Sequence, residues 1–499
     1  MPALKIALVS SEVAPFAKTG GLADVVAALA RALHRAGHDV RVFLPLYGKL
    51  SGGPYGFRPV KGLTEKTLDF PGGKVQYAVQ TSPLPDSTPD AGLNRGKTLE
   101  VEFIDAPELY HRSGFYTDEP DEPVRWATLC RAMLETCQNT GWGPDIVHAN
   151  DWHAGLLPLY LKDWYGWDEL FAGTRSLLSI HNIGYQGVFP AKVVDQLGLQ
   201  EGRDRFHQRH LEDGQVSFLE TGLIYADWVS TVSRTYAREI QTAEYGMGLE
   251  TLLEQRSDHL TGIVNGIDTD EWNPATDPLI PHHFSATAPS GKAAMKRELQ
   301  KRMGLDPGPE GIRGPLLIGI VSRMTAQKGF DLLPDILPVL LRGDDVRMVI
   351  LGSGEERYEK YFSWLQETHP EKVGLRLGYD NELAHWIEAG SDLFLMPSRY
   401  EPCGLNQMYS LRYGSVPLVR HTGGLADTVE RWDHAERSGT GFVFGEFSSE
   451  ALMATLRHVL QVWAEPTAWD VLMQNGMTKD FSWDRQAERY TDLYTSLLD

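Results

Sequence analysis

The chain has 499 residues, of which 42% are hydrophobic and 23% are charged, and its formal net charge at pH 7 is −20. This length exceeds what one hydrophobic core organises, so we expect a globular protein of two large or three small domains. The acidic balance disfavours nucleic acid as a partner, because a phosphate backbone attracts a basic surface.

Cysteine content and hydropathy exclude further classes. The three cysteines form no Cys-x-x-Cys pair, so we expect neither a disulfide framework nor a cysteine-based zinc cluster. No apolar run approaches the ~20 residues of a membrane-spanning helix. Lys5 interrupts the first apolar run, so no signal peptide is apparent. We therefore expect a cytoplasmic protein that does not act at a membrane.

The first half of the sequence alternates apolar, strand-like runs with helical segments. Apolar residues between Leu22 and Leu33 recur at the spacing of one helical face, and Gly37 is positioned to end that helix. Such alternation predicts a parallel sheet covered on both faces. The predicted strands of this half are residues 6–10, 40–44, 75–81, 99–104, 145–148, 176–180 and 228–232.

The second half repeats the alternation more regularly. Its predicted strands are residues 316–321, 347–351, 373–377, 393–396, 416–419 and 441–444. Its predicted helices lie near residues 329–342, 355–369, 381–390, 404–414 and 449–464. Ligands of open α/β sheets bind beyond the carboxyl ends of the strands, so the informative residues are those that directly follow a predicted strand.

The hexapeptide Thr-Gly-Gly-Leu-Ala-Asp occurs twice, at residues 19–24 and 422–427. Each copy follows a predicted buried strand and opens a segment with helical spacing. A glycine pair at a helix start exposes backbone N–H groups, and the helix dipole favours negative charge there. Two doubly wound units whose glycine turns bind a phosphorylated ligand are the first hypothesis, and a pair of ordinary turns is the alternative.

Three cations lie beside predicted turns of this kind. Lys18 directly precedes the first glycine pair, which is typical of a pyrophosphate site. Arg323 and Lys328 flank the turn after the strand at 316–321, and an arginine can grip a phosphate through two parallel hydrogen bonds. These residues predict an anion site, with solvated loop charges as the alternative.

Two histidine segments also follow predicted strands. His148, Asp151 and His153 could hold a metal, but no further ligand cluster is evident, so we expect none. Asp151 could equally cap the next helix. His181 and Asn182 end the strand at 176–180 and lead into a glycine turn. The histidine could recognise a hydroxyl group of a ligand or have a purely structural role, and the sequence leaves both interpretations open.

The segment at 398–405 follows the predicted strand at 393–396. Glu401 lies at that strand end, and Gly404 is positioned to open a helix. A carboxylate beside N–H donors can hold sugar hydroxyls through charge-assisted hydrogen bonds, although a helix dipole also favours a glutamate there. Cys403 has no evident partner base, so we interpret it as a packing residue.

Taken in order, these segments resemble one family, that of bacterial glycogen synthase and plant starch synthase. The resemblance runs from residue 4 to the end without interruption, and the ordered set makes it specific. The segments that carry it are residues 18–25, 148–153, 181–187, 265–268, 322–323, 327–329, 401–405 and 422–427.

The resemblance implies an α/β protein with the GT-B fold, in which two Rossmann-like, doubly wound domains face a central cleft. It implies an N-terminal domain at residues 1–265 on the acceptor side, completed by a C-terminal helix at 484–499. The donor side is then a C-terminal domain at residues 266–483. The proline-rich stretch from 266 to about 291 is the expected linker or hinge.

The reaction that the resemblance implies is the transfer of glucose from ADP-glucose to the non-reducing end of an α-1,4-glucan, in glycogen biosynthesis, with retention of anomeric configuration. No cofactor and no metal are implied. The residues alone leave the choice between ADP-glucose and UDP-glucose open.

The resemblance also assigns roles to residues, position by position. Arg323 and Lys328 match the pair that neutralises the leaving diphosphate, and His181 matches the histidine beside the anomeric carbon. The residues matched to catalysis are His181, Glu401, Arg323, Lys328 and Asp151. Those matched to donor binding are Lys18, Gly20, Gly21, Arg323, Lys328, Glu401, Cys403, Gly404 and Leu405. Those matched to the acceptor side or to support of the site are Asp24, Tyr116 and Asn182.

One position departs from the wider GT-B superfamily. Many retaining members carry a second glutamate eight positions after the first, and here that position is Tyr409. Three alternatives remain: a GT-B transferase with a small or lipid acceptor, a nicotinamide dehydrogenase, and a glucan-binding protein without activity. The dehydrogenase is disfavoured because the first turn contains only Gly20-Gly21 rather than Gly-x-Gly-x-x-Gly.

Overall fold

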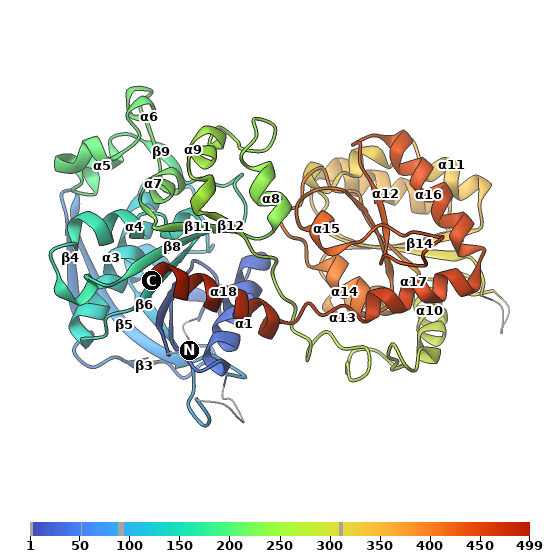
Figure 1. Ribbon diagram of the computed structural model, residues 1–499, viewed down its shortest axis with the longest axis horizontal. Helices are drawn as coiled ribbons and strands as arrows, with labels where there is room; N and C mark the ends of the chain where they lie inside the picture. Colours follow the sequence, from blue (N-terminus) through green and yellow to red (C-terminus); the bar gives the residue numbers. More distant parts are fainter. Residues whose placement is uncertain (1–2, 51, 88–93, 309–312) are drawn as a thin grey trace. The chain divides into compact units, whose positions relative to one another are not determined.

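The computed structural model describes residues 3–50, 52–87, 94–308 and 313–499. By its internal contacts the chain divides into two compact units (Figure 1). The N-terminal unit comprises Met1–Val232, Ala237–Gly266 and Trp483–Asp499, and the C-terminal unit comprises Ser233–Tyr236 and Ile267–Ser482. Each unit is built around its own sheet.

The sheet of the N-terminal unit has, in the described ranges, ten strands in the order β12-β11-β8-β7-β1-β2-β6-β5-β3, with β4 paired to β5. Neighbours from β12 to β6 are parallel, whereas β3, β4 and β5 form an antiparallel edge. The central strands are buried along most of their length, as expected for a sheet covered on both faces. The strands are β1 (Lys5–Val9), β2 (Asp39–Pro45), β3 (Arg58–Pro59), β4 (Lys66–Phe70), β5 (Gly73–Pro83), β6 (Glu100–Asp105), β7 (Ile146–Asn150), β8 (Arg175–Ile180), β11 (Trp228–Thr231) and β12 (Leu260–Gly262).

Helix α1 (Gly21–Arg35) begins within the first glycine pair, and Gly37 follows its end with a φ of 102°. The last helix, α18 (Trp483–Leu498), belongs to the N-terminal unit and lies beside α1 (Figure 1). Arg35 at the end of α1 forms an ion pair with Asp484 at 2.7 Å. Helix α8 (Arg234–Glu239) begins in the segment assigned to the C-terminal unit. The other elements of the N-terminal unit are α2 (Pro107–Tyr110), α3 (Glu122–Thr140), α4 (Leu157–Leu159), α5 (Val193–Gln196), α6 (Gln208–Glu212), α7 (Phe218–Tyr225), α9 (Glu250–Gln255) and the hairpin of β9 (Val188–Pro190) and β10 (Gln215–Ser217).

The described part of the C-terminal unit contains a parallel six-stranded sheet in the order β15-β14-β13-β16-β17-β18. Its core consists of apolar residues from these strands and from the helices that pack on the sheet. The strands are β13 (Leu316–Val321), β14 (Val346–Gly352), β15 (Val373–Leu377), β16 (Leu393–Met396), β17 (Val416–Arg420) and β18 (Phe442–Phe444). The helices are α10 (Ser290–Arg302), α11 (Leu337–Gly343), α12 (Glu356–Thr368), α13 (Asn381–Gly390), α14 (Asn406–Arg412), α15 (Gly423–Thr428), α16 (Ser449–Trp463) and α17 (Pro466–Met477).

Every strand predicted from the sequence is confirmed, with bounds that differ by at most two residues. The predicted helix at 329–342 is instead two short pieces, a 3₁₀ turn at Phe330–Leu332 and α11, because Pro334 lies between them. The antiparallel strands β3 and β4, the parallel edge strand β12, the β9–β10 hairpin and the helices α10 and α17 were not predicted.

The stretch expected as a linker, residues 266–291, is largely packed into the C-terminal unit. The Trp272 ring stacks on His385 and Tyr409 at centroid distances of 3.9 and 3.8 Å. Asp277 is fully buried and accepts hydrogen bonds from Tyr413 Oη at 2.6 Å and from the His385 ring at 2.8 Å. These contacts fix the stretch. The main part of the C-terminal unit begins at Ile267, and the chain returns to the N-terminal unit at Trp483.

Among the described residues, no helix combines the length and the apolar character that a membrane crossing requires.

Candidate active site

The first glycine turn, between β1 and α1, is organised by a carboxylate that sequence reasoning did not single out. Glu12 is 3% exposed and accepts hydrogen bonds from Thr19 N at 2.5 Å, Thr19 Oγ1 at 2.6 Å and Gly20 N at 3.2 Å. One N–H group of the glycine pair that we expected to face a ligand, that of Gly20, is thus bonded within the chain. The signal available in the sequence was a Ser-Glu pair directly after a predicted strand.

Lys18 lies next to this turn, where its ammonium group is half-exposed. Its Nζ forms an ion pair with Asp24 Oδ1 at 2.8 Å, and the two side chains are 50% and 36% exposed. Burial raises the pKa of Asp24 above its ordinary value, and the nearby Lys18 partly offsets that effect. An exposed pair of this kind contributes little to stability, so the ammonium can turn to an anionic ligand at small cost.

Tyr116 joins the same cluster from a loop between α2 and α3. Its hydroxyl donates to Glu12 Oε1 at 2.5 Å and lies 3.0 Å from Ser11 Oγ, while its ring stacks on His153. The residue is 38% exposed, so part of it remains open to solvent. Tyr116 therefore presents an aromatic surface beside the glycine turn.

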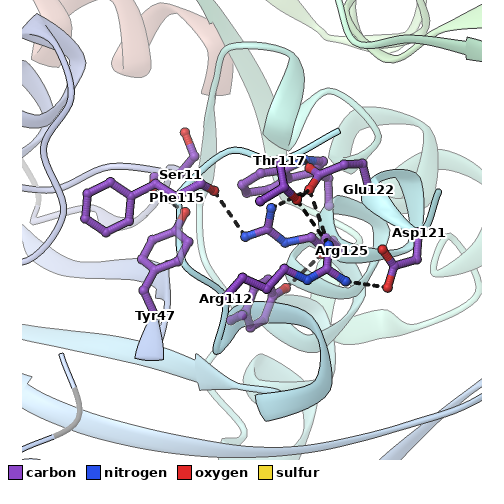
Figure 2. A network of polar contacts seen from close by, with 10 residues as sticks. Ser11, Tyr47, Arg112, Phe115, Thr117, Asp121, Glu122 and Arg125 are labelled. Atoms are coloured by element: carbon purple, nitrogen blue, oxygen red, sulfur yellow. Dashed lines mark hydrogen bonds and ion pairs between the residues drawn. The ribbon is translucent and has the colours of Figure 1, made fainter. Parts of the chain in front are cut away.

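A buried arginine holds the segment that carries Tyr116. Arg125 is fully buried and donates to Glu122 Oε1 at 2.6 Å and to the Phe115 carbonyl at 3.1 Å (Figure 2). Glu122 also accepts from Thr117 Oγ1, and Arg112 pairs with Asp121 (Figure 2). A buried charge needs such partners, and here they fix both sides of Tyr116 to the start of α3.

Asp151 follows β7 and does not act as the side-chain cap that the sequence allowed. Its Oδ1 accepts a hydrogen bond from His181 N at 2.7 Å, and it makes no capping bond to the 3₁₀ turn that begins at Trp152. Its φ is 56°, a left-handed conformation that is rare for a residue other than glycine and often marks a functional site. Burial raises the pKa of this carboxyl to about 7.

His181 follows β8 and is uncharged at neutral pH, because desolvation lowers its pKa to about 4. Its Nε2 lies 2.9 Å from Asn150 Oδ1, while Asn150 Nδ2 donates to the carbonyls of Val9 and His148. The amide oxygen therefore faces the ring, so Nε2 carries the proton and Nδ1 is left as an acceptor. The Asn182 side chain instead accepts from Gly184 N at 3.0 Å and holds the turn.

The side chains of His148, Asp151 and His153 do not form a group of converging ligand atoms in the described chain. Both ring nitrogens of His148 are engaged, Nδ1 with Tyr494 Oη at 2.8 Å and Nε2 with Ser179 Oγ at 2.6 Å. His153 Nδ1 lies 3.2 Å from Ser11 Oγ. Burial lowers the pKa of both histidines, that of His148 to about 3.

In the C-terminal unit, the turn after β13 brings Lys328 to the end of β16. Lys328 Nζ forms an ion pair with Glu401 Oε2 at 2.5 Å, and the side chains are 18% and 7% exposed. Ser398 Oγ donates to the same oxygen at 3.0 Å. A carboxylate with these partners and an ammonium group that is still partly exposed form a compact polar centre at the carboxyl ends of two parallel strands.

Arg323 lies on the same turn but is exposed, and its guanidinium forms no ion pair with the residues that the structure describes. Its position after β13 leaves all of its donors available to an anion. Tyr409, the position at which many GT-B enzymes carry a second glutamate, stacks on Trp272 and supports the fold.

The turn after Glu401 is supported by the second glycine pair. Gly424 N donates to the carbonyls of Glu401 at 3.1 Å and Pro402 at 3.2 Å. Gly404 has a φ of 72°, and Gln407 Nε2 donates to the carbonyls of Cys403 and Gly404, each at 3.0 Å. Helix α14 begins two residues later, at Asn406, with Leu405 as its N-cap. Cys403 is buried, in line with a packing role.

Comparison with known proteins matches both units. Residues 5–255 match the family described as "Starch synthase catalytic domain", and residues 307–470 match that described as "Glycosyl transferases group 1". The chain belongs to the glycogen synthase and starch synthase family. It is therefore a glycosyltransferase, and its two Rossmann-like units are those of the GT-B fold.

Similarity to individual proteins extends over the whole chain. A protein named glycogen synthase from Anaeromyxobacter dehalogenans (strain 2CP-C) is 45% identical over 99% of this chain and 100% of its own length. One from Koribacter versatilis (strain Ellin345) is 45% identical over 98% of each chain. The solved catalytic domain of starch synthase IV from Arabidopsis thaliana, bound to ADP and acarbose, matches 100% of both chains with a TM-score of 0.87 and 34% identity.

Proposed function

We propose that this protein transfers glucose from ADP-glucose to the non-reducing end of an α-1,4-glucan in glycogen biosynthesis, with retention of anomeric configuration. The observation that carries the proposal is the Lys328–Glu401 ion pair at the carboxyl ends of β13 and β16, within a chain of this family. The names of its relatives and the ADP and acarbose bound to its structural neighbour support the choice of donor and acceptor.

In the proposed roles, the C-terminal unit binds the donor. Arg323 and Lys328 neutralise the negative charge that develops on the leaving diphosphate, because fixed cations stabilise such charge without reorganisation. Glu401 holds glucose hydroxyls. Backbone groups at the start of α14, from Cys403, Gly404 and Leu405, complete the donor site.

The proposed roles in the N-terminal unit begin with Lys18, which pairs with the donor diphosphate after releasing Asp24. Gly20 and Gly21 let the donor approach the backbone closely. His181 accepts a hydrogen bond from a glucose hydroxyl at the unprotonated Nδ1. Residues assigned to the acceptor side or to support of the site are Asp24, Tyr116, Asp151 and Asn182.

The mechanism that we favour is front-face displacement. The bond between the anomeric carbon and the diphosphate oxygen breaks, the acceptor oxygen bonds to that carbon on the same face, and the leaving diphosphate takes the acceptor's proton. Neither Asp151, which accepts a backbone N–H group, nor Glu401, which pairs with Lys328, is assigned as a covalent nucleophile. Trapping of a glucosyl adduct on an aspartate or glutamate would exclude this mechanism.

The direct test offers ADP-, UDP- and GDP-glucose in competition on a glucan primer, and then offers ADP-glucose with glucan or with small alcohols. We expect incorporation from ADP-glucose into the glucan, with α-1,4 linkages in the product. Preferential transfer to a small or lipid acceptor would support the other GT-B interpretation. Glucan binding without incorporation from any donor would support a non-catalytic binding protein.

A further inference from the structure

A second cluster of potential ligands lies in the N-terminal unit on α6 and α7. The side chains are those of His207, His210 and Glu220, and their ligand atoms all lie within 4.8 Å of one another. His210 Nδ1 is 2.7 Å from Glu220 Oε2, and His207 Nδ1 is 3.8 Å from Glu220 Oε1. We infer that these three side chains bind a divalent transition-metal ion, with Zn²⁺ as the best fit.

The charge of Glu220 is the first argument for a cation. Glu220 is 4% exposed, and among the described residues its ion-pair partners are only these two histidines. Neither Lys nor Arg pairs with it in that set. A buried carboxylate without a permanently charged partner is costly. A bound divalent ion would supply the missing charge.

The backbone that carries the ligands is already fixed. Ser217 Oγ caps α7 by accepting from Glu220 N at 3.2 Å, so the carboxylate projects from the first turn of an anchored helix. His207 directly precedes α6 and His210 lies within it, and the centroids of their rings are 4.7 Å apart. Phe206 and Leu211 are buried on either side of them and anchor this segment.

The chemistry of the donors selects the metal. Two imidazole nitrogens and one carboxylate oxygen suit zinc and its neighbours in the first transition row, whereas Mg²⁺ and Ca²⁺ prefer oxygen ligands. Zn–N bonds of about 2.0–2.1 Å place tetrahedral ligand atoms about 3.3 Å apart. The observed separations of 2.7 and 3.8 Å lie on either side of that value. His207 and His210 are 42% and 36% exposed, so their rings can adjust and a fourth position is left for water.

The bound ion would join α6 to α7, and the start of α7 supports the segment after His181. Leu219 N donates to the Gln186 carbonyl at 3.1 Å, and Phe218 N donates to the Gly187 carbonyl at 3.0 Å. The start of α7 therefore holds the end of the 181–187 turn. We assign the ion a structural role, in which it stabilises α6 and α7 without contacting substrate.

The test uses the full-length protein after treatment with a chelator and exchange into metal-free buffer at pH 7.5. Titration calorimetry with ZnCl₂ should give one equivalent of tight binding and a higher thermal midpoint. Binding should be at least about 100-fold weaker in His210→Ala and in Glu220→Gln, since each removes one of three protein ligands. Co²⁺ should give the intense visible absorption of a tetrahedral site in the wild type, and the two variants should lose it.

His434→Ala is the matched control, because His434 is a half-exposed histidine that pairs with a glutamate in the C-terminal unit. It should bind zinc as the wild type does. His210 is partly exposed and Glu220→Gln preserves shape, and circular dichroism of each variant will verify folding. Equal zinc affinity in the wild type and the three variants would overturn the inference, and so would several weak sites without a tight one. The cluster would then be an ordinary His–Glu ion pair.

Discussion

The same six residues, Thr-Gly-Gly-Leu-Ala-Asp, form a strand-to-helix turn in each unit, yet their surroundings differ. In the first copy, a Cβ on Gly20 would meet no atom within 4 Å, and its N–H group is bonded to the Glu12 carboxylate. In the second copy, a Cβ would lie 1.9 Å from the Glu401 carbonyl oxygen at Gly423 and 2.1 Å from that of Cys403 at Gly424.

The difference shows that one sequence motif can require glycine for two physical reasons. The first copy borders open space, where a missing side chain matters to whatever approaches it from outside. The second copy allows two backbone segments of the C-terminal unit to touch, and thereby holds the turn that carries Glu401. Phosphate binding at both copies was the hypothesis from the sequence, and the contacts of Gly424 N make the second copy a scaffold instead.

The largest effect that we expect is on catalysis at the centre which the second copy supports. Lys328→Ala should lower turnover by about 10²–10³-fold, because loss of one preorganised donor to developing charge costs about 3–4 kcal/mol. Glucan affinity should change little. Initial rates and glucan-binding isotherms measure the two effects separately.

The matched control for that variant is Lys360→Ala, which removes an exposed lysine from α12 of the same unit. It should leave turnover unchanged. Equal losses of turnover and glucan affinity in Lys328→Ala would instead indicate that Lys328 belongs to a binding surface rather than to the reaction centre.

The second expected effect is on stability. Gly424→Ala places a methyl group against backbone atoms of Cys403 that cannot rotate away, and overpacking of this kind costs about 1–3 kcal/mol. We expect a lower midpoint for unfolding of the C-terminal unit and a loss of activity in proportion to the unfolded fraction. Differential scanning calorimetry measures the midpoint. An unchanged midpoint would show that the two glycine turns are more alike than their contacts suggest.

The sequence was sufficient to predict the strands of both units because buried parallel strands are continuous apolar runs bounded by turn residues. It failed for β3 and β4 at the antiparallel edge and for β12 at the opposite edge, because none of these strands is a continuous buried run. Residues at strand ends, such as Lys18 and Glu401, were found because ligands of such sheets bind there. Glu12 was missed because its partners are backbone N–H groups that only the folded turn brings to it.

The comparison extends to the carboxylates at the strand ends. Glu401 has the Lys328 ammonium group at 2.5 Å, whereas Asp151 is hydrogen-bonded to His181 N and its pKa is raised to about 7 by burial. Its ordinary pKa is 3.8, so the folded state binds a proton more tightly than the unfolded state. The native protein should therefore lose stability from this group as pH rises from about 4 through 7.

Asp151→Asn removes this titration while keeping the shape of the side chain. The thermal midpoint of the variant, relative to the wild type, should rise between pH 5 and pH 8 by the equivalent of about 3 kcal/mol. Thermal melts at matched ionic strength measure this difference. A difference that is constant over this pH range would show that Asp151 is ionised throughout.

The smallest and most discriminating change is Gly20→Ala. Gly20 has a φ of −154° and a ψ of −165°, an extended conformation that alanine adopts readily, and the added methyl group would meet no atom of the described chain within 4 Å. Folding gives no reason for glycine here, so the thermal midpoint should stay within about 1 °C of the wild type, unlike that of Gly424→Ala. We nevertheless expect kcat/KM for ADP-glucose to fall by about 10-fold, because a methyl group would obstruct close approach of the donor to the turn. Unchanged kinetics would mean that no substrate reaches this turn, and the first copy would then need an explanation other than ligand binding.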